Sequence, residues 1–201
     1  MKKVCLVTPL AKHIPEFEGF TYVGVDAGAY RLLEENKTPS FAIGDFDSMS
    51  QEELTSLQQI CPLVQHPIMK DQSDTELAIE TVLEQGAESI IVYGALGSRI
   101  DHSIANIRLM MYRYPQIVLM DEFQVMTVLT QGQHTIENTH PHVSFFPIEP
   151  SILSLQGFLY PLSSASLEMT DIYTLSNTIV EKKGTVIVEK GQVLCVQSSY
   201  K

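Results

Sequence analysis

The sequence is poor in basic residues, and this shortage limits the partners that it can bind. It has 13 Lys and Arg against 24 Asp and Glu, which gives a formal net charge of −11 at pH 7. Nucleic acids and anionic membrane surfaces attract basic faces, so we expect neither as a partner. An acidic chain suits a site that holds cations.

Long apolar runs are also missing. No apolar span reaches 18 residues, and the N-terminal Met1-Lys2-Lys3 leads directly into a short strand-like run. We therefore expect no membrane segment and no signal peptide. With 44% hydrophobic residues in 201 positions, the composition is typical of a globular protein with one large domain or two small ones.

Cysteine is scarce, and several familiar motifs are absent. Cys5, Cys61 and Cys195 lie far apart without Cys-x-x-Cys spacing, so we expect free thiols in a reducing cytoplasm. The chain has no Gly-Lys-Ser/Thr ending of a P-loop, no Gly-x-Gly-x-x-Gly and no Gly-x-Ser-x-Gly. These absences exclude a P-loop, a dinucleotide fingerprint and a nucleophile elbow, and no zinc pattern is present.

Short apolar runs alternate with helix-like stretches from residue 3 to about residue 118. The strand-like runs are 4–7, 22–25, 41–43, 63–65, 90–93 and 117–120. This alternation predicts a Rossmann-like, mostly parallel α/β domain. Ser73 to Glu76 forms a capping box that starts one helix, and Ile100, Ile104, Ile107 and Met111 form a helical stripe that we expect to face the core.

The pattern changes after about residue 121. Short alternating or β-branched runs, notably 185–188 and 193–196, are separated by Gly-containing turns. They predict a C-terminal antiparallel β-sandwich or barrel. We divide the chain into an α/β domain at 1–125 and an all-β domain at 126–201, although 123–129 could also continue the first sheet.

The segment 41–48 presents two carboxylates, Asp45 and Asp47, directly after a short buried strand. Residues i and i+2 of an extended chain point the same way, so both carboxylates can converge on one hard cation such as Mg²⁺, while Phe46 points into the core. The alternative is an Asx-turn pair that caps the next helix. Because Ser50, with Glu53, already supplies a capping box there, we favour the metal site.

Polar residues follow three further strands at their carboxyl ends. Asp26 follows 22–25, Asp71 and Asp74 come after 63–65, and Asp101 comes after 90–93. Ligands bind at this edge of an open parallel sheet. Carboxylates gathered there would repel one another unless a cation compensates, and Mg²⁺ with a polyphosphate would do so.

Individually these motifs are less specific. Gly94-x-x-Gly97-x-Arg99 could hold a phosphate through backbone N–H groups and the guanidinium, or could be a plain tight turn. Lys70 could neutralise phosphate or be a solvated surface lysine. We interpret His102 as a packing or supporting residue rather than a general base.

Taken in order, the motifs resemble those of the thiamine pyrophosphokinase (thiamine diphosphokinase) family. The matching segments are 26–29, 44–48, 70–76, 94–102 with Asn106, 157–162, 175–177 and 183–185. The resemblance covers nearly the whole chain, and the order of the motifs is far more specific than any one of them. It implies an N-terminal α/β domain, a C-terminal β domain for thiamine binding and dimerisation, a homodimer, Mg²⁺, and pyrophosphoryl transfer from ATP to thiamine.

The resemblance also assigns residues. Asp45, Asp47 and Asp74 match the catalytic, Mg²⁺-holding aspartates, and Ser176 and Asn177 match the thiamine-binding Ser-Asn pair. The residues expected to contact ATP, or the metal and its waters, are Asp26, Asp71, Gln72, Ser98, Arg99 and Asp101.

The sequence departs from the family pattern at a few positions. Glu76 stands where the family usually has Asp, Ser98 where it usually has a second Gly, and Thr174-Leu175 lacks the usual glycine before Ser-Asn. Tryptophan is absent, so the aromatic partner of thiamine is unassigned. The candidates for that partner are Phe145, Phe146 and Tyr173.

Two other functions are compatible with parts of the sequence. The Asp45-Phe46-Asp47-Ser48 motif superficially matches Mg²⁺-dependent phosphatases that use the first Asp as a nucleophile, although here the motif follows the third strand rather than the first. A non-catalytic nucleotide or vitamin sensor would use the same acids only to hold Mg²⁺.

Overall fold

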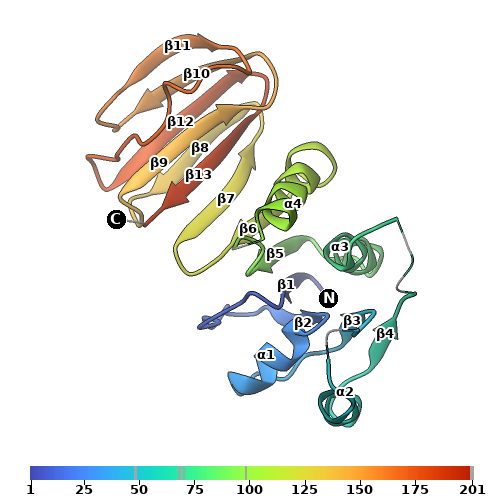
Figure 1. The fold of residues 1–201 in the computed structure, drawn as a ribbon. Coiled ribbons are helices and arrows are strands. Elements are labelled where there is room, and N and C mark those ends of the chain that lie inside the picture. The colour runs from blue at the N-terminus through green and yellow to red at the C-terminus, as the bar shows by residue number, and fades with distance from the viewer. Residues whose placement is uncertain (48, 68, 70, 98, 200–201) are drawn as a thin grey trace. The chain divides into compact units, whose positions relative to one another are not determined.

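The computed structural model describes residues 1–47, 49–67, 69, 71–97 and 99–199. The chain forms two units, Met1–Glu122 and Phe123–Lys201. The sequence placed this division after residue 125. Each unit has its own buried core, and Figure 1 labels the helices and strands of both units.

The described residues of unit 1 form six parallel strands, in the order β4-β3-β2-β1-β5-β6. The strands are β1 (Lys3–Val7), β2 (Thr21–Val25), β3 (Ala42–Gly44), β4 (Leu63–Gln65), β5 (Ser89–Tyr93) and β6 (Ile117–Met120). All six predicted strands are confirmed to within one residue at each end. The strand order reverses between β1 and β5, and the carboxyl ends beside such a reversal form a crevice that binds ligands.

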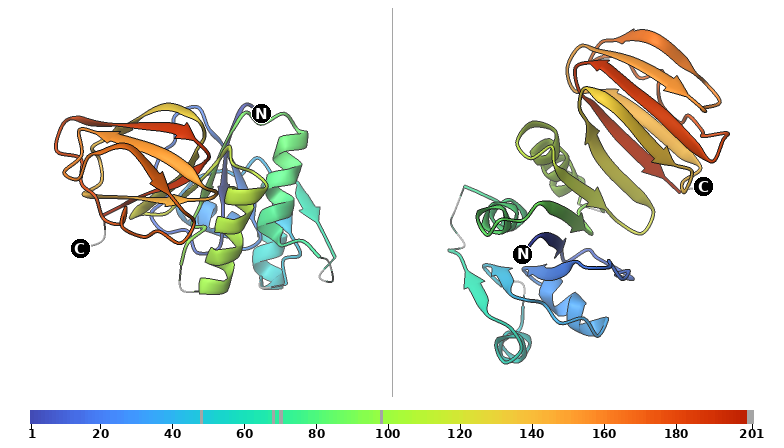
Figure 2. Two further views of the ribbon diagram at one scale, coloured as in Figure 1. Left: turned by 90° about the horizontal axis from the view of Figure 1, so that it is seen from above. Right: turned by 180° about the vertical axis from the view of Figure 1, so that it is seen from behind.

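Helices cover both faces of this sheet (Figures 1 and 2). Helices α1 (Gly28–Glu34) and α2 (Gln51–Gln58) lie on one face, and α3 (Asp74–Glu84) and α4 (Ile100–Tyr112) lie on the other. Ser50 and Glu53 form the complete predicted capping box of α2. In α3 the Ser73 hydroxyl accepts from the Glu76 N–H at 3.2 Å, and the chain turns away at Gly86, whose φ is 81°.

Two predictions about these helices are wrong in part. The Glu76 carboxylate does not complete the capping box of α3 but accepts a hydrogen bond from Arg113, just beyond α4. The expected core-facing stripe of α4 is exposed at Ile100 (68%) and Ile104 (51%). The buried face of α4 instead carries Ser103, Asn106, Leu109 and Met110, because the preceding loop needs polar partners there.

The described residues of unit 2 form two sets of antiparallel strands. One has the order β7-β13-β9 and the other β11-β10-β12-β8. The strands are β7 (Gln124–Leu129), β8 (Gly132–Glu137), β9 (His142–Pro147), β10 (Ser151–Gln156), β11 (Leu162–Leu167), β12 (Lys183–Lys190) and β13 (Val193–Ser198). One buried cluster joins both sheets, for example Phe145 of β9 with Leu153 of β10. β7 pairs with β13 over its whole length.

Cys5, Cys61 and Cys195 are free, as the sequence predicted, and all three are buried. Among the residues that the structure describes, no helix has the length and apolar character needed to span a membrane.

Candidate active site

A cavity of about 380 Å³ opens at the carboxyl ends of β1, β2, β3 and β5 in unit 1. We call it the acidic cavity. It is lined by Thr8, Pro9, Leu10, Asp26, Asp45, Asp47, Asp74, Thr75, Gly94, Ala95, Arg99, His102 and Asn106. The structure therefore brings together four of the predicted aspartates and Arg99.

The backbone after β3 explains how Asp45 and Asp47 reach the cavity. Phe46 lies between them with a φ of 59° and is 4% exposed, so its ring packs in the core while its neighbours line the cavity. The Asp45 Oδ1 atom accepts a hydrogen bond from the Asp47 N–H at 3.1 Å. The segment thus has the Asx-turn contact, and both side chains still line the cavity.

Asp26 and Asp74 enter from neighbouring elements. Asp26 follows β2 in the left-handed region, with a φ of 49°, and its N–H donates to the Ile43 carbonyl at 2.8 Å. A Cβ at Gly44 would lie 3.0 Å from the Asp26 Cα, a tighter contact than side chains usually make, so glycine suits this close approach. Asp74 is the first residue of α3, where a negative charge is stabilised by the helix dipole.

The loop after β1 forms one wall of the cavity and is fastened to the end of β5. The Thr8 hydroxyl donates to the Gly94 carbonyl at 2.5 Å, and the Tyr93 hydroxyl donates to the carbonyls of Lys12 and His13. Burial raises the pKa of Tyr93 to about 12, so it stays a protonated donor. Sequence reasoning missed Thr8, Pro9 and Leu10, although their place directly after β1 is the signal that could have found them.

The start of α4 supplies the cationic side of the site. The Arg99 guanidinium lies 2.5 Å from the Asp101 carboxylate, and this hydrogen bond holds the pKa of Asp101 below its usual range. The Asn106 amide donates to the Ala95 carbonyl at 2.8 Å, which fixes the loop against α4. The Gly97 N–H donates to the Ser103 hydroxyl at 3.1 Å, so in this arrangement that backbone donor already has a partner.

The carboxylates of the cavity fit a hard cation, but not a closed protein cage. Within the described residues, no three acidic, His or Cys side chains lie close enough together to hold a metal ion. Mg²⁺ usually takes only one or two carboxylates and completes its shell with phosphate oxygens and water. The donor set therefore matches a metal that enters together with a polyphosphate.

The other predicted ATP residues lie around the cavity or outside the described residues. Asp71 lines a separate groove between α3 and α4, and Gln72 is exposed beside the start of α3. Asp101 is held beside the cavity by its pairing with Arg99. Ser48, Lys70 and Ser98 lie outside the described residues.

The predicted thiamine residues are in unit 2. Ser176 is exposed and has a φ of 57°. Asn177 is 4% exposed, and its amide donates to the Tyr160 carbonyl at 2.8 Å while its oxygen accepts from the Tyr160 and Thr178 N–H groups. Phe145 is fully buried in the core, so of the three aromatic candidates only Phe146 and Tyr173 reach the surface.

Comparisons with known proteins match both units. The model of the thiamin pyrophosphokinase catalytic domain matches residues 19–120, and the model of the thiamin pyrophosphokinase vitamin B1 binding domain matches residues 133–193.

Whole-chain relatives agree with the domain models. A thiamine pyrophosphokinase of Bacillus subtilis is 30% identical over 99% of this chain and all of its own length. A crystal structure of a thiamine pyrophosphokinase from Bacillus subtilis, 28% identical, has a TM-score of 0.88 over 99% of this chain and 100% of its own. The structure of a thiamin pyrophosphokinase family protein from Enterococcus faecalis, 28% identical, also has a TM-score of 0.88 and covers both chains completely. The chain thus belongs to the thiamin pyrophosphokinase family.

Proposed function

We propose that the acidic cavity holds Mg²⁺ and the polyphosphate of ATP during the reaction of this family, the ATP-dependent pyrophosphorylation of thiamine. One observation carries the proposal. Asp26, Asp45, Asp47 and Asp74, from three different elements, line one cavity together with Arg99.

The chemistry requires positioning and charge stabilisation more than covalent catalysis. The thiamine hydroxyl oxygen forms a bond to the β-phosphorus, the bond from that phosphorus to the α-phosphate oxygen breaks, and AMP leaves with that oxygen. When bound, Mg²⁺ would neutralise charge on the transferring group and screen the aspartates from one another.

The chain's own residues have distinct parts in this proposal. Asp45, Asp47 and Asp74 would hold the metal, and Asp26 would lie near the metal or its waters. Asp47 or Asp74 would accept the hydroxyl proton. Arg99, held by Asp101, would donate to phosphate oxygens, and Asp71, Gln72 and Ser98 are proposed to contact ATP as the family resemblance implies.

Thiamine binding is proposed for unit 2, in line with the match to a vitamin B1 binding domain. Ser176 and Asn177 are the proposed contacts. A homodimer is also proposed, and the exposed apolar side chains of unit 2 support it, because such side chains mark interfaces. They include Leu159, Tyr160, Ile172, Tyr173, Leu175 and Val180. The cytoplasmic location remains a prediction.

Product identity tests the proposed reaction. Purified protein is incubated with ATP, Mg²⁺ and thiamine, and the products are identified by mass spectrometry. We expect thiamine diphosphate and AMP in equal amounts, and no product when Mg²⁺ is chelated. Stoichiometric ADP would contradict the proposal. A beryllofluoride adduct on Asp45 would favour the phosphatase, and ATP and thiamine binding without turnover would favour the sensor.

A further inference from the structure

The acidic cavity has one wall that carries no charge, formed by the loop directly after β1. Thr8, Pro9 and Leu10 line the cavity there, and among the described lining residues Leu10 has the largest apolar side chain. A leucine side chain can neither hold a cation nor bond a phosphate oxygen. Its contribution to the site is therefore the exclusion of water from the space that it borders.

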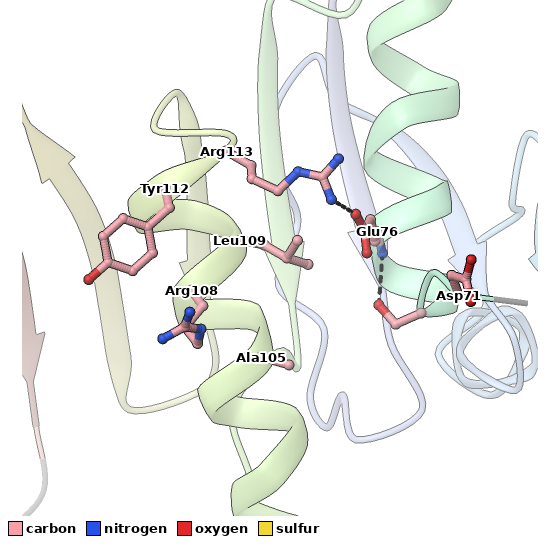
Figure 3. Close-up of a pocket in the computed structure, with 8 residues that line it drawn as sticks. Asp71, Glu76, Ala105, Arg108, Leu109, Tyr112 and Arg113 are labelled. Atoms are coloured by element: carbon pink, nitrogen blue, oxygen red, sulfur yellow. Dashed lines mark hydrogen bonds and ion pairs between the residues drawn. The ribbon is translucent and has the colours of Figure 1, made fainter.

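A neighbouring depression places its leucine differently. In the groove between α3 and α4, Leu109 lies among charged side chains, and Arg113 is ion-paired to Glu76 (Figure 3). Leu109 is 9% exposed there, whereas Leu10 is 40% exposed at the acidic cavity. Leu10 thus presents apolar surface to the space in which the substrates are proposed to react.

The wall lies between the two polar sides of the cavity. The strands at this edge of the sheet follow the order β3-β2-β1-β5. Asp45 and Asp26 come directly after β3 and β2, Arg99 comes after β5, and the wall comes after β1 between them. A phosphoryl group that is stabilised from the carboxylate side and by Arg99 at the same time therefore lies in front of this wall.

Leu10 is held in place by direct packing on the loop after β5. A Cβ added to Gly97 would lie 2.6 Å from the Leu10 Cδ1 atom, so the leucine side chain rests on the Gly97 backbone. The neighbouring backbone is bonded as well, because the Pro9 carbonyl accepts a hydrogen bond from the Arg31 Nε–H at 3.4 Å. These contacts fix the leucine side chain over the loop that leads into Arg99.

Water competes with the acceptor hydroxyl in the proposed reaction. A water oxygen that attacks the β-phosphorus would form a bond to it, the bond from that phosphorus to the α-phosphate oxygen would break, and the products would be AMP and pyrophosphate, with the water protons passing to solvent. Active sites suppress such side reactions by excluding water. The aspartates and Arg99 attract water, whereas the Leu10 side chain offers it no hydrogen bond.

We infer that Leu10 is a specificity-determining residue, which keeps water away from the β-phosphorus so that the acceptor hydroxyl attacks instead. The inference rests on the proposed function, because it takes the acidic cavity as the site of pyrophosphoryl transfer. Leu10 acts by filling space beside the transferring group and takes no part in proton transfer or charge stabilisation.

The test measures how often water splits ATP. Leu10→Ala removes most of the apolar wall, and Leu10→Met refills it with an apolar side chain of similar volume. Each protein is incubated with ATP and Mg²⁺ in water labelled with heavy oxygen, with and without thiamine. AMP, pyrophosphate and thiamine diphosphate are then quantified by mass spectrometry, which also locates the label.

We expect Leu10→Ala to release AMP and pyrophosphate without thiamine about tenfold faster than the unchanged protein, because an open wall lowers the barrier for attack by water. The label should appear in pyrophosphate and not in AMP, since the β-phosphorus is attacked. With thiamine present, AMP should exceed thiamine diphosphate. Leu10→Met should restore the low rate of splitting.

Ile60→Ala is the matched control. Ile60 is 46% exposed just beyond α2 in unit 1 and is not among the described residues that line the cavity. This variant loses a comparable exposed apolar side chain and should split ATP no faster than the unchanged protein. Tripolyphosphate binding, measured by calorimetry without turnover, should stay within about twofold in Leu10→Ala, because the charged groups of the cavity are intact.

Several results would overturn the inference. Splitting of ATP without thiamine would stay at the level of the unchanged protein in Leu10→Ala, or it would rise equally in Leu10→Met or Ile60→Ala. Label in AMP or in free phosphate would place the attack on another phosphorus and would also refute the role of Leu10. Failure of the proposed function is separate, since the unchanged protein would then form no thiamine diphosphate from ATP and thiamine.

Discussion

The two units use polar side chains near their predicted sites in opposite ways. In unit 1, turns at Asp26 and Phe46 place carboxylates along an open cavity. In unit 2, Asn177 is buried, and its amide bonds the backbone of Tyr160 and Thr178. The side chains of unit 1 line a space for a ligand, whereas that of Asn177 holds a loop.

The largest effect is expected from a substitution in the acidic cavity of unit 1. Asp45→Asn should lower kcat about 10²-fold or more, because a ligand of the proposed metal and its charge are lost. The fold should persist, and the thermal midpoint without Mg²⁺ should stay the same or rise, since one of several repelling carboxylates is removed. Steady-state kinetics measure kcat, and a thermal melt measures the thermal midpoint. Unchanged activity would remove Asp45 from the metal site.

Asn177→Ala tests the other half of the comparison, the buried polar side chain of unit 2. We expect the KM for thiamine to rise about tenfold, because the loop beside the proposed thiamine contact Ser176 loses a buried hydrogen bond that fixes it, and the KM for ATP to stay within about twofold. Stability should also fall, because the Tyr160 backbone groups lose their partner.

Asn138 provides the matched control for this substitution. Its amide also bonds two backbone carbonyls of unit 2, those of Ile179 and Glu181. Asn138→Ala should therefore reduce stability and leave the KM for thiamine unchanged. If both variants raise that KM equally, general loosening of unit 2 explains the effect and the role of Asn177 is refuted.

Thr8→Val has a smaller expected effect and tests how firmly the cavity wall is held. The variant removes the donor of the buried bond to the Gly94 carbonyl, which should reduce the free energy of unfolding by about 1–3 kcal/mol. Urea unfolding measures the loss. Thr8→Ser keeps the hydroxyl and should retain most of the stability. A larger loss in Thr8→Ser than in Thr8→Val would show that the methyl packing, and not the hydrogen bond, stabilises the wall.

The smallest effect on stability is expected for Asp101→Asn. The Arg99–Asp101 pair is exposed, so its loss should leave the urea midpoint unchanged within error. The pKa of Asp101 is lowered in the folded chain, so any contribution exists above the ordinary Asp pKa and disappears as the pH falls through the lowered value. The KM for ATP should nevertheless rise. A large stability loss with an unchanged KM would make the pair purely structural.

The sequence predicted the parts of the site that depend on strand ends. Each strand of unit 1 was visible as a short apolar run, and the carboxyl ends of parallel strands meet at one edge. Asp26, Asp45, Asp47 and Asp74 could therefore be grouped from their positions in the chain alone. Thr8 and Leu10 were missed although they also follow a strand end, because they carry no charge and act through a hydrogen bond and a close contact with the loop after β5.

Helix α4 shows why other parts of the fold and of the candidate site could not be predicted from the sequence. Its isoleucine stripe has the period of a buried face, but periodicity indicates only that a face is apolar, not which surface covers it. The sheet-facing side contains Ser103 and Asn106 because the loop at 94–97 presents backbone groups that need partners. Likewise, the Ser-Asn motif does not reveal whether the Asn177 amide faces a ligand or the backbone.

The bond between Thr8 and Gly94 joins residues 86 positions apart, and this separation matters while the chain is being made. β1 also pairs directly with β5, so the centre of the sheet is incomplete until β5 has been synthesised. At a synthesis rate of about 5–20 residues per second, β1 is complete several seconds before β5 has been synthesised. During this interval the apolar edge of β1 is open to wrong pairing. A nascent chain that ends before β5 should therefore bind no nucleotide and should be especially sensitive to proteases.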